Sequence, residues 1–594
     1  MADLTADLSR AGTEAIRAGF EVFIGERGRI TARARERFER RAWAEAQDDA
    51  RERLDLGERI VNETVGAVRA ELGGAAHDRE VWRRLKDRYL AAVEGLPAAE
   101  IALTFFNSVT RRVFATVGVD RDIEFLAMDA PAPRTAAFPV RTFRREVTTD
   151  HLLRKILEAF GFGVPYEDLA RDARLAAIEL DAHLRELRDG QPIDAVEMAA
   201  PVFFRGKGAY LAGRIRRGRF TTPLVLALVH GERGIVLDAA LFTPEDVSIV
   251  FSFTRSYFHV EAPSPRDLVG FLSSLLPQKR RSELYISIGF EKHGKTEMYR
   301  ELVRHLEESG DRFVPARGDR GLVMTVFTLP GLELVFKVIK DVFAPPKQTT
   351  RREVMDKYRH VFRHDRAGRL VDAQEFRDLE FPLARFSPEV LEELRGLCAG
   401  SIEERGGLVR LKHLYAERRL MPLNLFIREA DEWTARQAVL DFGQALRDLA
   451  ATNTFPGDLL LKNFGVTRNR RVIFYDYDEL ARVTECNFRD MPSGGGGPGG
   501  GDDDDLYGWG GSSEPAFYVG KDDVFPEEFL PFLGLPGRLR QVFLEAHGEL
   551  LSAGWWRGMQ ERVRHGEIVD IYPYREQQRL RYAWPDAPRK PEAA

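Results

Sequence analysis

The feature that most constrains this 594-residue chain is a set of polar residues in fixed order in its second half. FPGDLLLKNFG (455–465) places Asp458 ahead of Asn463 with the spacing D-x-x-x-x-N, and Asp476 ends the predicted strand VIFYD thirteen residues later. In protein kinases the first aspartate orients the acceptor hydroxyl, and the asparagine and the later aspartate bind magnesium. The order predicts a kinase-like phosphotransferase site with Asn463 and Asp476 as Mg²⁺ ligands.

Earlier in the chain lie a turn and a lysine that suit a nucleotide. ARGDRGL (316–322) falls between two predicted strands, and its Gly318 and Gly321 would let backbone lie over a triphosphate. Lys337 follows on the next strand, within VFKVIK, where a lysine can pair with the α- and β-phosphates. Strand alternation points Lys340 to the opposite face, so Lys337 is the predicted ATP lysine.

The set departs from the protein-kinase pattern in several places. Pro456-Gly457 replaces the usual His-Arg before Asp458, and Asp478 stands where kinases carry a glycine after the second magnesium ligand. Lys462 adjoins Asn463, whereas kinases commonly carry this lysine two residues after the aspartate. The acidic partner of Lys337 is not fixed by the sequence. Glu353, in REVMDKYRHVF, is a candidate, but a solvated helix position is favoured for it. Small-molecule kinases of the aminoglycoside or choline type fit the same motifs and stay open, as does a catalytically silent kinase-like module.

A second phosphate-binding pattern competes with the first. GFEKHGKT (289–296) satisfies G-x-x-x-x-G-K-[ST], with Lys295 for phosphate and Thr296 for magnesium. It follows ELYISI, predicted to be a strand, and precedes a predicted helix. Bulky charged residues fill the loop, however, and no alternation of strands and helices surrounds it. A surface turn between a strand and a helix is the favoured interpretation, and a P-loop NTPase is an alternative.

Length and pattern together predict an α+β protein of two domains. A chain of 594 residues exceeds what one hydrophobic core supports. The first 110 or so residues show helical periodicity, and helices are also expected over 150–160 and 165–188. Residues 201–260 read as strands, including VSIVFSFTRSYFHVE (247–261). We predict a mainly helical regulatory domain over 1–310 with this strand-rich part, then a bilobal kinase-like domain over 311–594.

Within the second domain, strands are expected near 311–340 and over 408–419, with helical segments between them. The Gly- and Asp-rich segment 493–511 is predicted to be a disordered loop, because it cannot bury apolar surface.

Charge and cysteine content exclude several classes of function. The formal net charge of −5 gives no general attraction to nucleic acid or to a membrane surface. Two cysteines rule out a disulfide framework, and no apolar run of signal-peptide or membrane-spanning type is present. A cytoplasmic location is therefore expected, with neither nucleic acid nor membrane as a partner.

Several long strings resemble one enzyme family. They are ELYISIGFEKHGKTEMYR (283–300), VMTVFTLPGLELVFKVIKDVFAPPKQTTRREV (323–354), HDRAGRLVDAQEF (364–376), HLYAERRLMPLN (413–424), FPGDLLLKNFGVTR (455–468) and VIFYDYDE (472–479). Together they resemble the bifunctional isocitrate dehydrogenase kinase/phosphatases over most of the chain. The segment 493–511 is unlike the family.

The resemblance implies an enzyme that uses ATP and Mg²⁺, with Mn²⁺ possible, to phosphorylate a serine of NADP-dependent isocitrate dehydrogenase, and that also removes the phosphate. Control by adenine nucleotides is implied, with AMP as an allosteric effector. Asp372 is implied in the phosphatase reaction, although its local sequence suggests only an exposed acid near a helix start. Asp458 and Lys462 complete the predicted catalytic set. The implied nucleotide loop consists of Ala316, Arg317, Gly318, Asp319, Arg320, Gly321 and Leu322.

Overall fold

The computed structural model describes residues 2–116, 120–125, 138–188, 190–252, 256–345, 347, 349–364, 367–491, 520 and 522–580. The chain forms two compact units. The first runs to Leu420 and includes the chain from Asp570 on, and the second is Met421–Val569. The chain therefore enters the second unit at residue 421 and returns to the first at residue 570.

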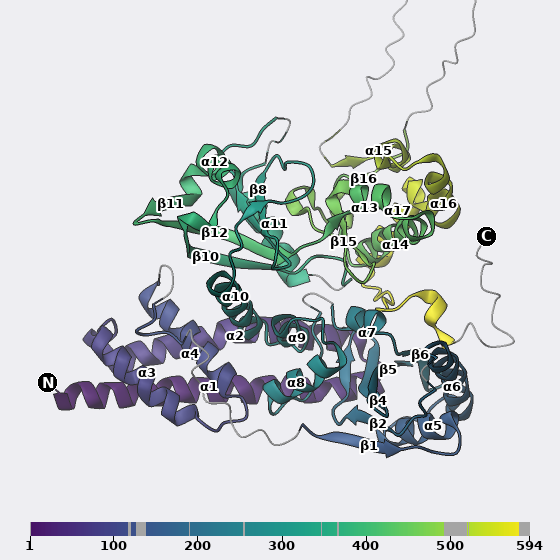
Figure 1. The fold of residues 1–594 in the computed structure, drawn as a ribbon, viewed down its shortest axis with the longest axis horizontal. Coiled ribbons are helices and arrows are strands. Elements are labelled where there is room, and N and C mark those ends of the chain that lie inside the picture. Colours follow the sequence, from purple (N-terminus) through teal and green to yellow (C-terminus); the bar gives the residue numbers. More distant parts are fainter. Residues whose placement is uncertain are drawn as a thin grey trace, which may run out of the picture. The chain divides into compact units, whose positions relative to one another are not determined.

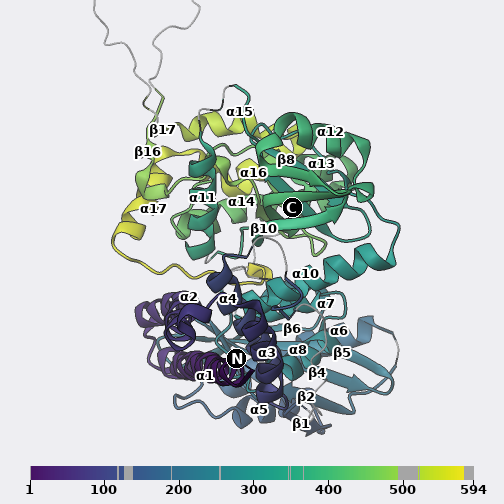
Figure 2. The same cartoon turned by 90° about the vertical axis from the view of Figure 1, so that its left-hand side faces the viewer.

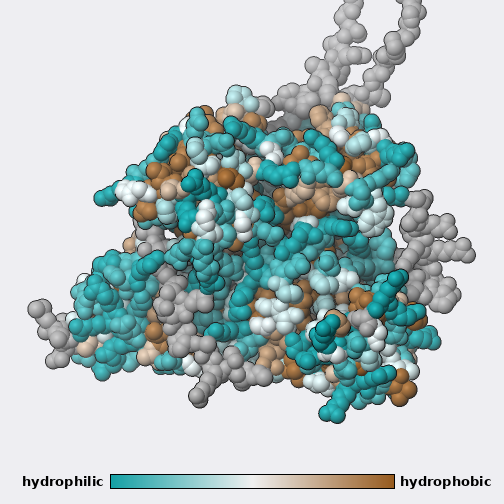
Figure 3. Space-filling model, in the orientation of Figure 1, coloured by the Kyte–Doolittle hydropathy of each residue, from teal (hydrophilic) through white to brown (hydrophobic). Residues whose placement is uncertain are grey.

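Four helices begin the first unit, which confirms the helical prediction for this part of the chain. They are drawn in purple in Figures 1 and 2, and the face of them visible in Figure 3 is mostly hydrophilic. The apolar positions that recur at helical spacing on the second helix, such as Ile60 and Val68, are buried in a core shared with its neighbours. The helices are α1 (Ala2–Glu39), α2 (Trp43–Leu72), α3 (Arg79–Val93) and α4 (Ala99–Phe114).

An antiparallel sheet in the order β1-β2-β4-β5-β6, with β3 paired to β4, follows these helices. Alternation along β5 buries both faces: Leu224 and Leu226 pack with α5 and α6, whereas Val225 joins the core of the N-terminal helices. The elements are β1 (Val140–Arg144), α5 (Thr149–Ala159), α6 (Leu169–Glu186), β2 (Ala195–Ala199), β3 (Phe203–Arg205), β4 (Gly208–Arg217), β5 (Phe220–His230) and β6 (Ile235–Leu241).

Two segments predicted as strands are helices instead. Residues 247–250 lie in α7 (Pro244–Val250), and most of ELYISI lies in α9 (Arg281–Ser287). Short apolar runs do not distinguish a strand from a buried helix. The start of α7 does carry helix signals, since the Thr243 side chain accepts a hydrogen bond from the Asp246 amide and Pro244 follows at once. The neighbouring helices are α8 (Pro265–Leu275) and α10 (Glu291–Glu308).

A second antiparallel sheet, in the order β10-β12-β9-β8-β7 with β11 paired to β12, completes the first unit. One face packs against α10 and α12, where Leu302 and Leu394 join Phe327 and Phe336 in a single core. The elements are β7 (Val314–Pro315), β8 (Met324–Leu329), β9 (Leu334–Ile339), α11 (Arg351–His364), β10 (Ala373–Pro382), α12 (Pro388–Leu397), β11 (Ile402–Arg405) and β12 (Leu408–Arg418). The strand expected over 408–419 is confirmed, but β10 was expected to be helical.

The second unit is mostly helical, with two very small sheets. The elements are β13 (Met421–Pro422), α13 (Leu423–Glu429), α14 (Glu432–Ala451), β14 (Phe464–Val466), β15 (Val472–Phe474), β16 (Asn487–Phe488), β17 (Asp523–Val524), α15 (Phe529–Leu533), α16 (Gly537–His547) and α17 (Ala553–Arg564). The predicted loop 493–511 lies outside the described residues. None of the described helices could span a membrane. The predicted α+β class is confirmed.

The returning segment is fixed to the first sheet by a buried polar cluster. Arg579 donates from Nε and Nη2 to the Asp238 carboxylate at 2.8 Å each, and the Tyr574 hydroxyl donates to the same carboxylate at 2.7 Å. Asp238, on β6, is only 2% exposed. The last described residues, up to 580, are therefore packed into the first unit against β6.

Candidate active site

The predicted ATP lysine forms a buried ion pair on the second sheet. On β9, Phe336 and Val338 point into the hydrophobic core, so Lys337 lies on the opposite face. Its Nζ is 2.7 Å from the Glu417 carboxylate, and the two residues are 5% and 2% exposed. Burial raises the pKa of Glu417, and the Lys337 charge opposes that rise. Glu417, on the neighbouring strand β12, is the acidic partner that the sequence left undetermined.

Helix α11 reaches this ion pair through a tyrosine. The Tyr358 hydroxyl lies 3.4 Å from the second oxygen of Glu417, and its ring stacks on Tyr415 with centroids 3.9 Å apart. The alternative acid on this helix, Glu353, instead accepts the backbone amide of Thr350 at 2.7 Å and caps the helix start.

Acidic side chains continue along the same region of the sheet. Asp372 stands half-buried directly before β10, accepts a hydrogen bond from Gln374 at 2.9 Å, and contributes to the raised pKa of Glu417. The expectation of an exposed acid at a helix start is therefore wrong. Further along β10, a hydrogen bond with His413 lowers the pKa of Glu375 to about 2.

The predicted nucleotide loop joins β7 to β8. It starts with the Ala316 amide donating to the Val326 carbonyl at 3.2 Å, and residues 317–322 are exposed. Gly318 has φ 118°, in the left-handed region that favours glycine. Lys340, on the other side of the strand from Lys337, donates from Nζ to the Gly321 carbonyl at 2.6 Å. Lys340 thus stabilises the loop by binding its backbone, and not by facing the nucleotide side of the strand.

In the second unit the D-x-x-x-x-N loop is bonded within itself. The Asn463 side-chain amide donates to the Asp458 carboxylate. Asn463 is 5% exposed, whereas Asp458 is exposed. This orientation leaves the Asn463 amide oxygen as the group available to a cation. The Asn463 carbonyl accepts the Tyr475 amide at 3.1 Å, which fixes the loop to the residue before Asp476.

A close backbone approach explains why Gly457 stands where kinases carry the arginine before the aspartate. Gly457 has φ 87°, and a side chain there would meet the Glu479 Cβ at 2.5 Å and its carbonyl oxygen at 2.6 Å. On either side, Phe455 and Ala481 exchange two backbone hydrogen bonds of 2.9 Å. Only glycine fits at position 457, so an arginine there is excluded by the path of the chain. Lys462 is exposed, and its carbonyl accepts the Tyr475 hydroxyl.

The competing P-loop pattern does not form a phosphate loop. Residues 291–296 are the first turns of α10, so the residues that would surround phosphate are helical. Burial lowers the pKa of Lys295 to about 7, and its Nζ lies 4.8 Å from the centre of the Phe376 ring. His293 is buried, and its Nδ1 forms a 2.8 Å hydrogen bond with the Thr104 hydroxyl on α4. The pattern 289–296 thus spans the end of a short connection between two helices and the start of α10, not a loop between a strand and a helix.

Comparison with known proteins decides the family. Residues 311–576 match the kinase domain of isocitrate dehydrogenase kinase/phosphatase (AceK), and residues 13–310 match the regulatory domain of the same family. The chain belongs to the isocitrate dehydrogenase kinase/phosphatase family.

Curated members of this family align with nearly all of the chain. An isocitrate dehydrogenase kinase/phosphatase of Anaeromyxobacter sp. (strain Fw109-5) is 71% identical over 97% of this chain and 98% of its own length. One of Anaeromyxobacter dehalogenans (strain 2CP-C) is 69% identical over 98% and 100%. A more distant relative, of Xanthomonas euvesicatoria pv. vesicatoria (strain 85-10), is 43% identical over 96% and 97%. The resemblance drawn from the sequence is confirmed.

Membership of the isocitrate dehydrogenase kinase/phosphatase family removes the alternative assignments. A small-molecule kinase of the aminoglycoside or choline type and a P-loop NTPase using Lys295 are both wrong. Among the residues that the structure describes, no group of three or more His, Cys, Asp and Glu side chains is arranged to hold a metal ion. A magnesium ion bound with a nucleotide needs only one or two protein carboxylates, because phosphate oxygens and water supply the other ligands.

Proposed function

We propose that this protein phosphorylates a serine of NADP-dependent isocitrate dehydrogenase and also removes that phosphate. The observation that carries the proposal is the 71% and 69% identity, over essentially complete chains, to proteins named isocitrate dehydrogenase kinase/phosphatase. The two activities would control carbon flux between the citric acid cycle and the glyoxylate bypass. We place the regulatory part in residues 1–310, the kinase-like part in 311–594, and the enzyme in the cytoplasm.

ATP would bind to the first unit through the loop 316–322 and Lys337. The exposed loop offers backbone amides, and Arg317 and Arg320 bring positive charge to it. Lys337 would contact the α- and β-phosphates. The 2.7 Å contact with Glu417 supports this role because it holds the ammonium group in place on a rigid strand.

Mg²⁺, or Mn²⁺ in its place, would be held by Asn463 and Asp476. The Asn463 hydrogen bond to Asp458 fits this role, since it directs the amide nitrogen away from the cation and leaves the oxygen. The cation supplies neutralisation of the charge that develops on the phosphate oxygens. Asp458 would orient the serine hydroxyl and accept its proton. Lys462, next to the metal ligand in sequence, would stabilise the transferred phosphoryl group.

The reverse reaction needs a different nucleophile, either water or ADP. Asp372 would orient that water against the phosphoserine. Two observations support this role. Asp372 is half-buried, and its charge helps to raise the pKa of Glu417, so its carboxylate lies near the Lys337–Glu417 ion pair. We propose that AMP acts as an allosteric effector that shifts the balance between the two reactions.

One experiment tests the function directly. The purified full-length protein is incubated with γ-labelled ATP, Mg²⁺ and purified NADP-dependent isocitrate dehydrogenase. Label should appear on a serine of the dehydrogenase, and removal of ATP followed by addition of ADP and AMP should release it. A dehydrogenase that stays unlabelled at equimolar enzyme would contradict the proposal.

A further inference from the structure

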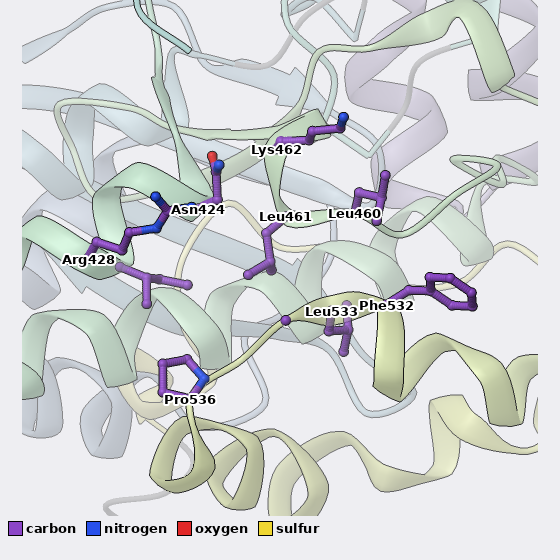
Figure 4. Close-up of a pocket in the computed structure, with 10 residues that line it drawn as sticks. Asn424, Arg428, Leu460, Leu461, Lys462, Phe532, Leu533 and Pro536 are labelled. Atoms are coloured by element: carbon purple, nitrogen blue, oxygen red, sulfur yellow. The ribbon is translucent and has the colours of Figure 1, made fainter. Parts of the chain in front are cut away.

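The second unit contains a pocket that shares residues with the D-x-x-x-x-N loop but is not explained by nucleotide binding. Its volume is about 260 Å³. Three segments line it, and Figure 4 shows their side chains. They are Asn424, Ile427 and Arg428 of α13, Leu460, Leu461 and Lys462 of the loop, and Phe532, Leu533, Gly534 and Pro536 at the end of α15 and beyond.

The size of the pocket limits what it can hold. Sites for nucleotides and drug-sized molecules have volumes of roughly 300–1,000 Å³. At about 260 Å³ this pocket lies just below that range and suits one or two amino-acid side chains. Its size therefore favours part of a peptide over a whole adenine nucleotide.

The lining selects a particular kind of side chain. Six of the ten residues are apolar. Figure 4 shows Leu461, Leu533 and Pro536 around the same space, with the Phe532 ring directed outward at its edge. The only charged residues are Arg428 and Lys462, both positive, with no carboxylate among the ten. The Asn424 side-chain oxygen is buried and has no hydrogen-bond partner among the described residues. An apolar side chain with a neighbouring carboxylate, and a backbone amide for Asn424, would complement this surface.

The rim of the pocket also exposes a large aromatic side chain to solvent. Phe532 is 64% exposed, while the adjoining Leu533 is 2% exposed and anchors the segment. Exposed aromatic side chains beside a pocket are typical of protein-binding surfaces. Leu460 lies two residues from Asp458, a separation of at most about 7 Å along the chain. The residue bound in the pocket and the serine that Asp458 would orient should therefore lie near one another in the sequence of the bound segment.

We propose that this pocket is a docking site for the protein substrate, and that it binds an apolar residue with an acidic neighbour near the phosphorylated serine. The inference rests on the proposed function and adds a recognition element to it. It separates recognition of the protein from recognition of ATP, since the pocket residues Phe532 and Arg428 belong to no predicted nucleotide or metal contact.

The test uses two exposed pocket residues, so that folding is preserved. Phe532→Ala removes the apolar rim and Arg428→Glu reverses the charge. Trp433→Ala, at an aromatic residue that is 59% exposed on α14, and Arg436→Glu, on the same helix, are matched controls outside the pocket. Initial rates are measured with varied isocitrate dehydrogenase and with varied ATP, and thermal unfolding confirms an intact fold.

We expect the KM for isocitrate dehydrogenase to rise by about fivefold in Phe532→Ala and about tenfold or more in Arg428→Glu, as for contacts at the centre of an interface. The KM for ATP should stay within about twofold of wild type in all four variants.

An unchanged KM for the dehydrogenase in both pocket variants overturns the docking site but leaves the proposed function intact. An equal rise in the KM for ATP also overturns it, because the pocket would then act through the loop. A change of oligomeric state in the pocket variants would make a second copy the occupant and overturn it as well. A wild-type enzyme that does not label the dehydrogenase overturns the function and the docking site together.

Discussion

Two lysines follow phosphate-binding patterns, and their surroundings predict opposite consequences of removing them. Lys337 forms a 2.7 Å ion pair on a strand, whereas Lys295 lies in a helix with its pKa lowered to about 7 by burial. We expect Lys337→Ala to reduce phosphoryl transfer at least about 10²-fold, because charge stabilisation in the transition state is lost. Lys295→Ala should leave ATP affinity unchanged. Labelled-phosphate transfer and nucleotide titration measure both, and the reverse pattern would contradict the proposed ATP site.

Asp372 should separate the two activities. A serine is positioned by the docked protein that carries it, whereas water depends on side-chain hydrogen bonds for its alignment. We therefore expect Asp372→Ala to lower phosphate release by roughly 10²–10⁴-fold, the loss typical of missing acid–base assistance. Kinase activity should fall much less. Both rates are measured on one preparation, with Asp378→Asn, six residues further along in β10, as the control that removes a carboxylate but tolerates the left-handed φ of 53° at this position. Equal losses of both activities in Asp372→Ala would show a common structural role.

The spacing of residues along the chain was enough to predict only some members of the candidate site. Lys337, Asp458, Asn463 and Asp476 could be selected from the sequence because their order and strand positions are local patterns, although their roles stay predictions. Glu417 could not, since it lies eighty residues after Lys337 on a strand whose pairing with β9 no local pattern reveals. The preference for glycine at 457 likewise depends on the approach of Glu479.

At the scale of elements, α11 contacts the ion pair through one tyrosine, and this contact should matter for ATP. The stacked ring of Tyr358 supports Tyr415, and its hydroxyl is 3.4 Å from Glu417. We expect Tyr358→Ala to lower kcat/KM for ATP about tenfold, since a stacked aromatic pair and packing are lost.

Tyr358→Phe keeps the ring and should restore most of that loss, which a purely hydrogen-bonding role would not allow. Arg352→Ala, on the same helix, is the control and should behave as wild type, because the Arg352 side chain is 92% exposed and faces the exposed Asp356. Equal loss in the Phe and Ala variants would show that the hydroxyl, not the stack, positions Glu417.

Element type was predicted well where the pattern was long and poorly where it was short or interrupted. The N-terminal helices repeat their apolar positions over many turns. Strand β10 was missed because its burial pattern changes phase at Asp378, which has φ 53°. Phe376 and Leu379 are consequently buried three residues apart, a spacing that also fits a helix.

At the scale of the whole molecule, the contact between Asp238 and the returning segment should stabilise the first unit. Arg579→Met leaves the Asp238 carboxylate buried without its guanidinium, a change that costs about 3–5 kcal/mol. Arg562→Met breaks an ion pair with Glu567 in which both side chains are nearly half exposed, and it should cost only about 0–1 kcal/mol. Urea unfolding and limited proteolysis compare the two variants. Similar midpoints would show that the returning segment adds no stability.

The predicted boundary between residues 310 and 311 rested on a change from helical to strand-like sequence. In the structure, Met298, Leu302 and Leu306 of α10 share one core with Phe313 and Phe327 beyond that point. Arg385 also donates to the Leu306 carbonyl at 2.6 Å. Such packing between segments on either side of a composition change involves contacts across dozens of residues, which a reading along the chain does not reveal.

The double passage of the chain between the units has a consequence for biosynthesis. Ribosomes extend a chain by roughly 5–20 residues per second, so the segment between residues 421 and 569 takes roughly 7–30 s to make. During that time the first sheet exists without Tyr574 and Arg579, and Asp238 has no guanidinium to neutralise it. Folding of the first unit therefore cannot finish until the segment that carries Tyr574 and Arg579 has been made. A nascent chain that stalls within the second unit would present an incomplete first unit to chaperones and proteases.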